Sequence, residues 1–152
     1  MRRSLSLAAL ATLLAAGSAH AGECQAVRAR LEAATFTDGC KSPVGLCVAG
    51  TIQGSDGLGG TLLATVETLV PTAHDGRYAF TETLVVTTAR GALTFSSTGI
   101  FDAVNGRVSE LHEVSGGTGD FTGASGYLFE GTVATGAGTY AGDIQGRLCR
   151  AD

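Results

Sequence analysis

The segment that decides the fold spans residues 92–115 and has the sequence ALTFSSTGIFDAVNGRVSELHEVS. Its first half alternates apolar residues such as Leu93 and Phe95 with small polar ones, which is the period-two pattern of a half-buried strand. Asn105-Gly106 then provides the strongest two-residue hairpin signal in the chain, because both central residues of a type I′ turn need a positive φ. The segment therefore predicts two antiparallel strands joined by a tight turn.

The same alternation extends over most of the chain. Strands are predicted at residues 44–53, 60–71, 76–89, 92–102, 107–115, 125–135 and 138–149, with a short strand near 33–38. Residues 23–34 fit either a helix or a strand, since their apolar positions satisfy both periods. Successive antiparallel strands without intervening helices predict an all-β fold. We expect a single closed, up-and-down (calycin-like) barrel of about eight strands, because closure removes exposed sheet edges.

The composition agrees with a barrel and excludes several other classes. The chain has 152 residues with 23 glycines, a content that disfavours long helices. The glycines have no three-residue period, which excludes collagen, and the low charged fraction of 16% argues against disorder. Gly131, Gly142 and Gly146 lie inside predicted strands, where glycine favours the tight bending of a small barrel.

The N-terminus has the pattern of an export signal. Two arginines precede an apolar stretch at residues 5–16, and residues 19–21 form Ala-His-Ala, a small-x-small cleavage site. The apolar stretch is too short to span a membrane comfortably, and no second stretch of about 20 residues follows it. We expect residues 1–21 to be a signal peptide and residues 22–152 to form one domain in the periplasm or outside the cell.

The charge of the remaining chain bears on its partners. After removal of the signal, eight basic residues would face 14 acidic ones. An acidic surface repels phosphate backbones and anionic lipids. We therefore expect no nucleic-acid partner and no membrane partner.

Four cysteines in an exported chain indicate two disulfides. Cys24, Cys40, Cys47 and Cys149 include no C-x-x-C pair, and neither His74 nor His112 lies near them in the sequence, so no metal site is expected. The favoured pairing joins Cys40 to Cys47 in a local loop and Cys24 to Cys149 at the termini. A Cys47–Cys149 bond between neighbouring strands of a closed barrel is the competing hypothesis.

The most specific motif is GGTGDFTGASG at residues 116–126. Its glycines do not have the G-x-G-x-x-G spacing, and no helix is predicted after it, which argues against a phosphate-binding loop. Asp120 is out of register for a calcium-binding glycine–aspartate repeat, and only one copy is present. We interpret the motif as a turn between strands.

This motif, followed by the apolar residues 127–129, resembles the signature of the allene oxide cyclase/dirigent barrel superfamily. The similarity is greatest to bacterial secreted members that carry an allene oxide cyclase-like barrel domain, and segments 40–52 and 142–149 share the pattern. The resemblance implies an eight-stranded barrel with an apolar cavity that confines a reactive small molecule without metal or nucleotide, commonly in a trimer. Cyclases of this type steer ring closure of an unstable epoxide, and dirigent proteins steer the coupling of radicals. The residues that carry over, as a fold marker and not as catalytic groups, are Gly116, Gly117, Thr118, Gly119, Phe121 and Gly123.

Polar residues that share a strand face with apolar ones are the candidates for chemistry. Glu82 alternates with apolar neighbours, and burial there would raise its pKa, as a general acid or base requires. Glu110 and His112 share a face, close enough to hydrogen-bond and to tune the imidazole. The alternative for each strand is the opposite orientation, with these groups in solvent and residues such as Val85 or Leu111 inside.

Other residues are weaker candidates. Glu67 and Glu130 alternate with leucines and could also point inward, whereas His74 lies in a predicted turn and is expected to be exposed. The serines lack a G-x-S-x-G elbow, so serine hydrolysis is not expected. The residues predicted to bind the ligand are Tyr78, Phe80, Phe95 and Tyr127. Tyr127 and Tyr140 are further expected to pack with their hydroxyls near a rim.

The sequence thus predicts an exported barrel that binds or confines a small, largely apolar molecule without a cofactor. One alternative is a cofactor-free cyclase, isomerase-like or dirigent-like steering activity, with Glu82 or the Glu110–His112 pair as acid and base. Another is a purely structural or interaction barrel. An interior without inward carboxylates would exclude the enzyme, and a cavity below about 300 Å³ would count against any ligand.

Overall fold

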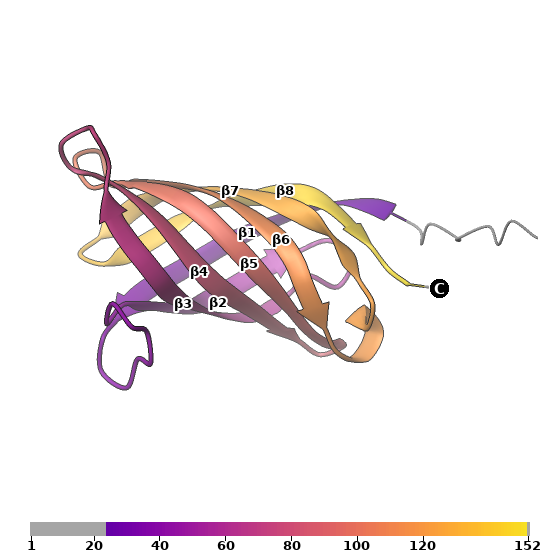
Figure 1. Cartoon of the computed structure of the whole chain (residues 1–152). Coiled ribbons are helices and arrows are strands. Elements are labelled where there is room, and N and C mark those ends of the chain that lie inside the picture. The colour runs from indigo at the N-terminus through magenta and orange to yellow at the C-terminus, as the bar shows by residue number, and fades with distance from the viewer. Residues whose placement is uncertain (1–23, 152) are drawn as a thin grey trace, which may run out of the picture.

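The computed structural model describes residues 24–151, which form a closed antiparallel barrel of eight strands (Figure 1). The strands are β1 (Cys24–Phe36), β2 (Cys47–Gly54), β3 (Gly60–Pro71), β4 (Arg77–Thr88), β5 (Gly91–Asp102), β6 (Arg107–Gly117), β7 (Ser125–Gly136) and β8 (Thr139–Cys149). A single turn of 3₁₀ helix, η1 (Gly119–Phe121), precedes β7. Each strand pairs with its neighbours in sequence, and β1 pairs with β8 to close the barrel. The prediction of an all-β, up-and-down barrel of about eight strands is confirmed.

The ambiguous N-terminal segment is the first strand of this barrel. β1 runs unbroken through residues 24–36, so both the helix alternative and the short strand near 33–38 are wrong. Val27, Ala29 and Leu31 are buried while the residues between them are exposed, as a strand on a barrel wall requires. Its backbone pairs with β2 on one side and β8 on the other, and this long-range pairing selects the strand.

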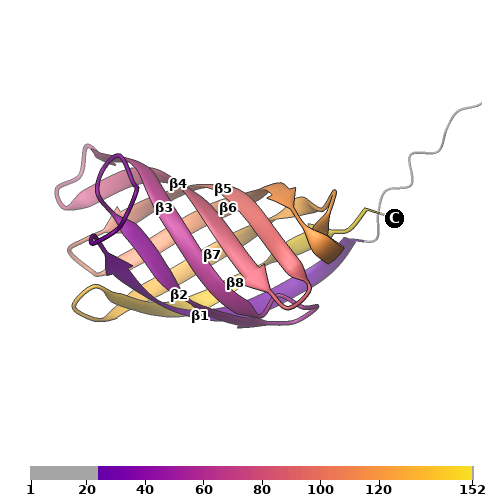
Figure 2. The same ribbon diagram turned by 90° about the horizontal axis from the view of Figure 1, so that it is seen from below.

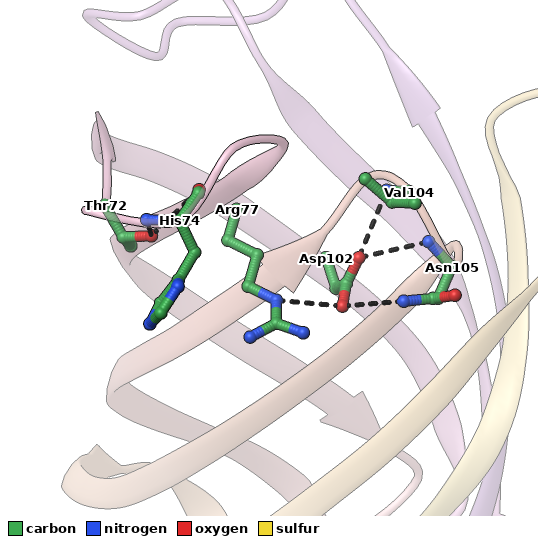
Figure 3. Close-up of polar contacts among 6 residues, drawn as sticks. All are labelled: Thr72, His74, Arg77, Asp102, Val104 and Asn105. Carbon is green, nitrogen blue, oxygen red and sulfur yellow. Dashed lines mark hydrogen bonds and ion pairs between the residues drawn. The ribbon is translucent and has the colours of Figure 1, made fainter.

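The predicted hairpin at Asn105-Gly106 forms, but its turn is longer than two residues. β5 ends at Asp102, and only Gly106 of the pair has a positive φ, 61°. The Asp102 carboxylate accepts hydrogen bonds from the backbone N–H groups of Val104 (3.1 Å) and Asn105 (3.0 Å), as Figure 3 shows. The type I′ prediction is wrong because this side chain stabilises a four-residue loop instead.

The two ends of the barrel are filled differently. At the end where the termini lie, Leu58 from the β2–β3 loop and Phe121 from η1 are buried in the core, with exposed fractions of 1% and 2%. The opposite end carries the loops at residues 37–46, 72–76 and 103–106, on the left in Figures 1 and 2. The apolar core therefore occupies the terminus-bearing half, which leaves the other half for a cavity.

Glycines allow close backbone approach at two kinds of position. Gly119, in the motif at residues 116–126, has a φ of 60°, and a Cβ atom there would lie 2.4 Å from the Arg90 carbonyl oxygen. Within β8, a Cβ on Gly146 would lie 2.1 Å from the Tyr127 carbonyl oxygen of β7. The glycine-rich motif is a turn, as predicted, and the glycine inside β8 lets that strand lie close against its neighbour.

The disulfides are Cys24–Cys149 and Cys40–Cys47, as the favoured pairing predicts. Cys24 and Cys149 face each other directly in the β1–β8 ladder. The competing Cys47–Cys149 bond is wrong because β1 lies between β2 and β8. Two disulfides and no free cysteine among the described residues place the protein in an oxidising, non-cytoplasmic compartment.

The predicted signal peptide at residues 1–21 lies outside the described residues. Within residues 24–151, no helix is long and apolar enough to cross a membrane.

Candidate functional site

A cavity of about 100 Å³ opens at the end of the barrel opposite the termini. Every strand contributes to its wall, which is mainly apolar or aromatic near the opening and carries three carboxyl groups further in. The lining residues are Thr35, Leu46, Val48, Val66, Leu69, Phe80, Glu82, Phe101, Val108, Glu110, Glu130, Thr132 and Tyr140. The cavity is smaller than the about 300 Å³ expected of a typical ligand pocket, so by the criterion stated from the sequence its volume counts against the ligand prediction, and it restricts any occupant to a very small molecule.

Strand register brings the polar side chains together inside the barrel. Glu82 on β4 pairs with Ser97 on β5, and Ser97 pairs with His112 on β6. Glu110 on β6 pairs directly with Glu130 on β7. Because inward residues of adjacent strands stand side by side, these groups form two adjoining rows, one across β4, β5 and β6 and the other across β6 and β7.

His112 is the central group of this cluster and has no exposed surface. Its Nδ1 lies 2.8 Å from Ser97 Oγ, within hydrogen-bond distance, and 3.8 Å from Glu110 Oε2. Its Nε2 lies 3.3 Å from Glu130 Oε2 without the geometry of a hydrogen bond. The imidazole is therefore held by the serine and flanked by two carboxyl groups.

Glu82 and Glu110 have pKa values far from those of free carboxyl groups. Burial, with the smaller effects of the negative charges of Glu82 and Glu130, raises the pKa of Glu110 to about 10. Burial raises the pKa of Glu82 to about 7, against the lowering effect of His112. The two groups hydrogen-bond, and since Glu110 has the higher pKa, its O–H donates to the Glu82 carboxylate.

The structure places all three catalytic candidates inside the barrel. Glu82 and His112 are buried, and the Glu110 side chain is 7% exposed. The opposite orientation of these strands is therefore wrong. Glu130, a weaker candidate, completes the cluster with a side chain that is 10% exposed.

Glu67 does not belong to the site. A β-bulge between Val66 and Thr68 shifts the register of β3 against β4. Val66 and Leu69 line the cavity, whereas Glu67 is exposed and accepts a hydrogen bond from Thr83 Oγ1 at 2.5 Å. Because Leu62, Ala64 and Val66 point inward, alternation places Glu67 on the outer face with Leu63. The sequence pairing of Glu67 with Leu69 fails because the bulge brings Leu69 to the inner face.

The predicted ligand-binding residues have different locations. Phe80 lines the cavity, whereas Tyr78 is half-buried at the rim and stacks on Phe101, with ring centroids 6.3 Å apart. Phe95 faces inward but lies in the core, where its ring meets His112 edge-on at 6.1 Å, and it does not line the cavity. Tyr127 is 44% exposed on the outer face, because Leu128 takes the inward position, so its assignment to the ligand site is wrong.

Sequence reasoning missed several residues of the site. Ser97, the partner of His112, is 1% exposed and stands two positions after Phe95, on the inward face. That alternation was the available signal for it. Leu46 also lines the cavity, but from the β1–β2 loop, where no periodic pattern indicates orientation.

Glu82, Glu110 and His112 have donor atoms within 4.8 Å of one another, and carboxylate and imidazole groups are the donor types of transition-metal sites. Metal binding needs deprotonated carboxylates and an available imidazole nitrogen. Here the raised pKa of Glu110 favours its protonated form at neutral pH, and the His112 Nδ1 atom near Glu110 already contacts Ser97. We interpret the group as a hydrogen-bonded acid–base cluster.

A second polar group lies at the rim and braces the loops. Arg77 Nε donates to Asp102 Oδ2 at 3.1 Å, next to the loop that Asp102 holds (Figure 3). Hydrogen bonds from Asn105 hold the pKa of Asp102 below its usual value. His74, in the neighbouring loop, is exposed as predicted and makes its hydrogen bonds through the backbone.

No protein-family model, curated protein or solved structure matches this chain. The resemblance to the allene oxide cyclase/dirigent superfamily therefore stays a prediction from the sequence, and the site is interpreted from its own geometry.

Proposed function

We propose that this protein confines a small, largely apolar molecule in the open half of its barrel. The observation that carries the proposal is a cavity whose wall is mainly apolar and whose inner end bears polar groups. Ligand sites combine the same two features, an apolar surface for affinity and a few polar groups for orientation.

The volume limits the size of the molecule. If each water-sized group occupies about 10–15 Å³, a cavity of about 100 Å³ has room for about seven to ten of them. A six-carbon molecule with one polar group fits this range, and a long acyl chain does not.

Titration with 1-hexanol tests the proposal, followed through the backbone amide signals in NMR spectra. We expect saturable shifts confined to residues that line the cavity. Val108→Phe would fill the opening and weaken binding by about tenfold or more, since a loss of about 1.4 kcal/mol suffices for that change. Val133→Phe on the outer face is the matched control and should bind as the wild type does. The absence of saturable shifts in the wild-type protein would refute the proposal.

The paired carboxyl groups support a second candidate function, a cofactor-free isomerase. Glu110, with a pKa of about 10, is protonated at neutral pH, while Glu82, with a pKa of about 7, can accept a proton. With a ketone in the cavity, the Glu82 carboxylate would take a proton from the α-carbon, whose C–H electron pair forms a C=C bond. The carbonyl π electrons move to oxygen, which takes the proton of Glu110. Return of a proton to a different carbon completes an isomerisation.

Exchange of the α-protons of cyclohexanone in D₂O tests this activity directly. The exchange rate should be greatest between about pH 7 and about pH 10, where Glu82 is ionised and Glu110 is protonated. Glu82→Gln or Glu110→Gln should lower the rate by about 100-fold or more. Glu113→Gln, on the exposed face of β6, is the control. Exchange at the same rate in all variants would contradict the role of the pair.

The disulfides support an exported location, and we propose that residues 1–21 direct the chain to the periplasm or the exterior. Determination of the N-terminal residue of protein purified from its native host would test this, with Gly22 expected.

A further inference from the structure

The wall of the cavity carries acidic side chains, and its described lining residues include no basic side chain. Among its described lining residues, Glu82, Glu110 and Glu130 are the ionisable groups besides Tyr140, and none is lysine or arginine. Groups on β4, β6 and β7 thus present carboxyl oxygens to the same space. A ligand carboxylate or phosphate would meet like charge there, whereas a cation or a hydrogen-bond donor would find acceptors.

One of these acceptors is unpaired although it is deeply buried. Glu110 Oε2 has no hydrogen-bond partner, and the Glu110 side chain is only 7% exposed. A buried polar atom without a partner destabilises the folded protein because it has lost its hydrogen bonds to water. Oε2 itself lies 3.8 Å from His112 Nδ1, away from the surface, while Glu110 as a residue lines the cavity. An N–H donor on a ligand at the inner end of the cavity would therefore give this carboxyl group a hydrogen-bond partner that the described residues do not fully supply.

The outer part of the cavity is aromatic. Phe80, Phe101 and Tyr140 line it, and the rings of Phe101 and Tyr140 lie edge to face with centroids 6.3 Å apart. Aromatic rings give the apolar body of a ligand a packing surface, and their faces also attract an ammonium group that approaches them. Aromatic rings that lead to carboxyl groups are the combination that suits an organic ammonium ion.

We propose that the molecule confined in the barrel is a small organic amine, bound as its ammonium ion with the nitrogen among Glu82, Glu110 and Glu130 and its apolar body between the aromatic rings. This inference rests on the proposed function and narrows its ligand class. A bare metal ion would satisfy the carboxyl groups but would leave the aromatic and apolar wall without a role.

The charge state of the cluster is consistent with such a ligand. Burial raises the pKa values of Glu82 and Glu110 to about 7 and about 10, so at neutral pH Glu110 keeps its proton and Glu82 is partly protonated. The other ionisable groups that face them are His112 on β6 and Tyr140 on β8, while the lining residues of β1, β2, β3 and β5 carry no charge. A bound ammonium would favour the ionised carboxylates, so binding should release protons and strengthen as the pH rises through about 7.

Three probes of one shape test the inference: hexylammonium, 1-hexanol and hexanoate, measured by calorimetry and by NMR titration at neutral pH. We expect hexylammonium to bind at least about tenfold tighter than 1-hexanol, and hexanoate to bind weakest. Between about pH 6 and pH 8 the affinity for hexylammonium should rise, by up to about tenfold per proton released and pH unit, while that for 1-hexanol stays level. The amine itself remains protonated below about pH 10.

Variants separate the acidic groups from the general shape of the cavity. Glu130→Gln should lower the affinity for hexylammonium toward that for 1-hexanol and leave the affinity for 1-hexanol unchanged. Glu113→Gln, an exposed carboxylate on β6, should change neither. A melting curve for each variant verifies folding, and the comparison of probes on the wild-type protein needs no variant.

The outcomes distinguish this inference from the proposed function. If 1-hexanol or hexanoate binds as tightly as hexylammonium, the amine inference is overturned and the proposed confinement stands. If none of the three binds, both fail. If Zn²⁺ binds tightly and hexylammonium does not bind, the carboxyl groups form a metal site and the amine inference is overturned.

Discussion

Glu110 faces Glu82 and Glu130 inside a barrel whose cavity-lining residues, within the described chain, include no lysine or arginine. A single buried carboxyl group avoids ionisation by keeping its proton, and a second one nearby makes ionisation harder still. Glu110 carries the largest upward pKa shift in this cluster for both reasons. The same side chain is therefore a proton donor at neutral pH and a source of instability at high pH.

The stability of the fold should fall as the pH rises from about 5 to about 9. The pKa values of Glu82 and Glu110 are raised in the folded protein to about 7 and about 10, so between the unfolded value of 4.5 and those values the folded state binds more protons. Each proton of difference lowers the free energy of unfolding by about 1.4 kcal/mol per pH unit. Below about pH 4.5 both states are protonated and the effect is fully retained.

Urea unfolding at several pH values measures this slope. Glu110→Gln, which cannot ionise, should flatten it by about one proton, whereas Glu113→Gln on the exposed face should leave it unchanged. A wild-type protein whose stability rises from pH 5 to pH 9 would show that the buried carboxyl groups do not control it.

At the scale of elements, β1 closes the barrel. It pairs with β2 and β8 at once, and its first residue, Cys24, is bonded to Cys149 at the end of β8. The bond secures the closing seam, where the two ends of the described chain meet. The Cys40–Cys47 bond closes a short loop beside the opening of the cavity.

The seam bond should contribute more to stability than the loop bond. Cys24–Cys149 closes a separation of 125 residues and Cys40–Cys47 one of 7. Because the entropy removed from the unfolded chain grows with loop length, replacing both seam cysteines by serine should cost about 2–5 kcal/mol, and replacing both loop cysteines should cost less. Denaturant unfolding of the two double variants measures the difference. An equal loss in both would show that loop length does not govern these bonds.

At the scale of the whole molecule, the apolar core and the cavity with its acidic cluster lie in different halves of the barrel along its axis. One half is filled by core side chains, with Leu58 and Phe121 as its cover, and the other half contains the cavity and the acidic cluster. The outer face is partly apolar, with Ile100, Phe129 and Val133 between 43% and 50% exposed. Such a surface is compatible with the homo-oligomer, commonly a trimer, that the family resemblance implies, and that assembly stays a prediction.

The sequence by itself determined the fold class and the positions of most strands. Alternating apolar residues and glycine-containing turns identify seven of the eight strands, since the period of a strand and the φ values of a turn are properties of short segments. The same alternation identifies Glu82, Glu110, His112 and Glu130 as residues able to share an interior. It leaves open which face of each strand is the inner one, because both faces of these strands carry apolar side chains.

Tertiary structure decided the remainder. Barrel closure made residues 24–36 a strand through partners far away in sequence, and it excluded the Cys47–Cys149 bond. The bulge after Val66 brought Leu69 to the inner face while Glu67 stayed outside, and strand register set Ser97 against His112. Orientation and register depend on contacts between strands, and those contacts exist only once the barrel has closed.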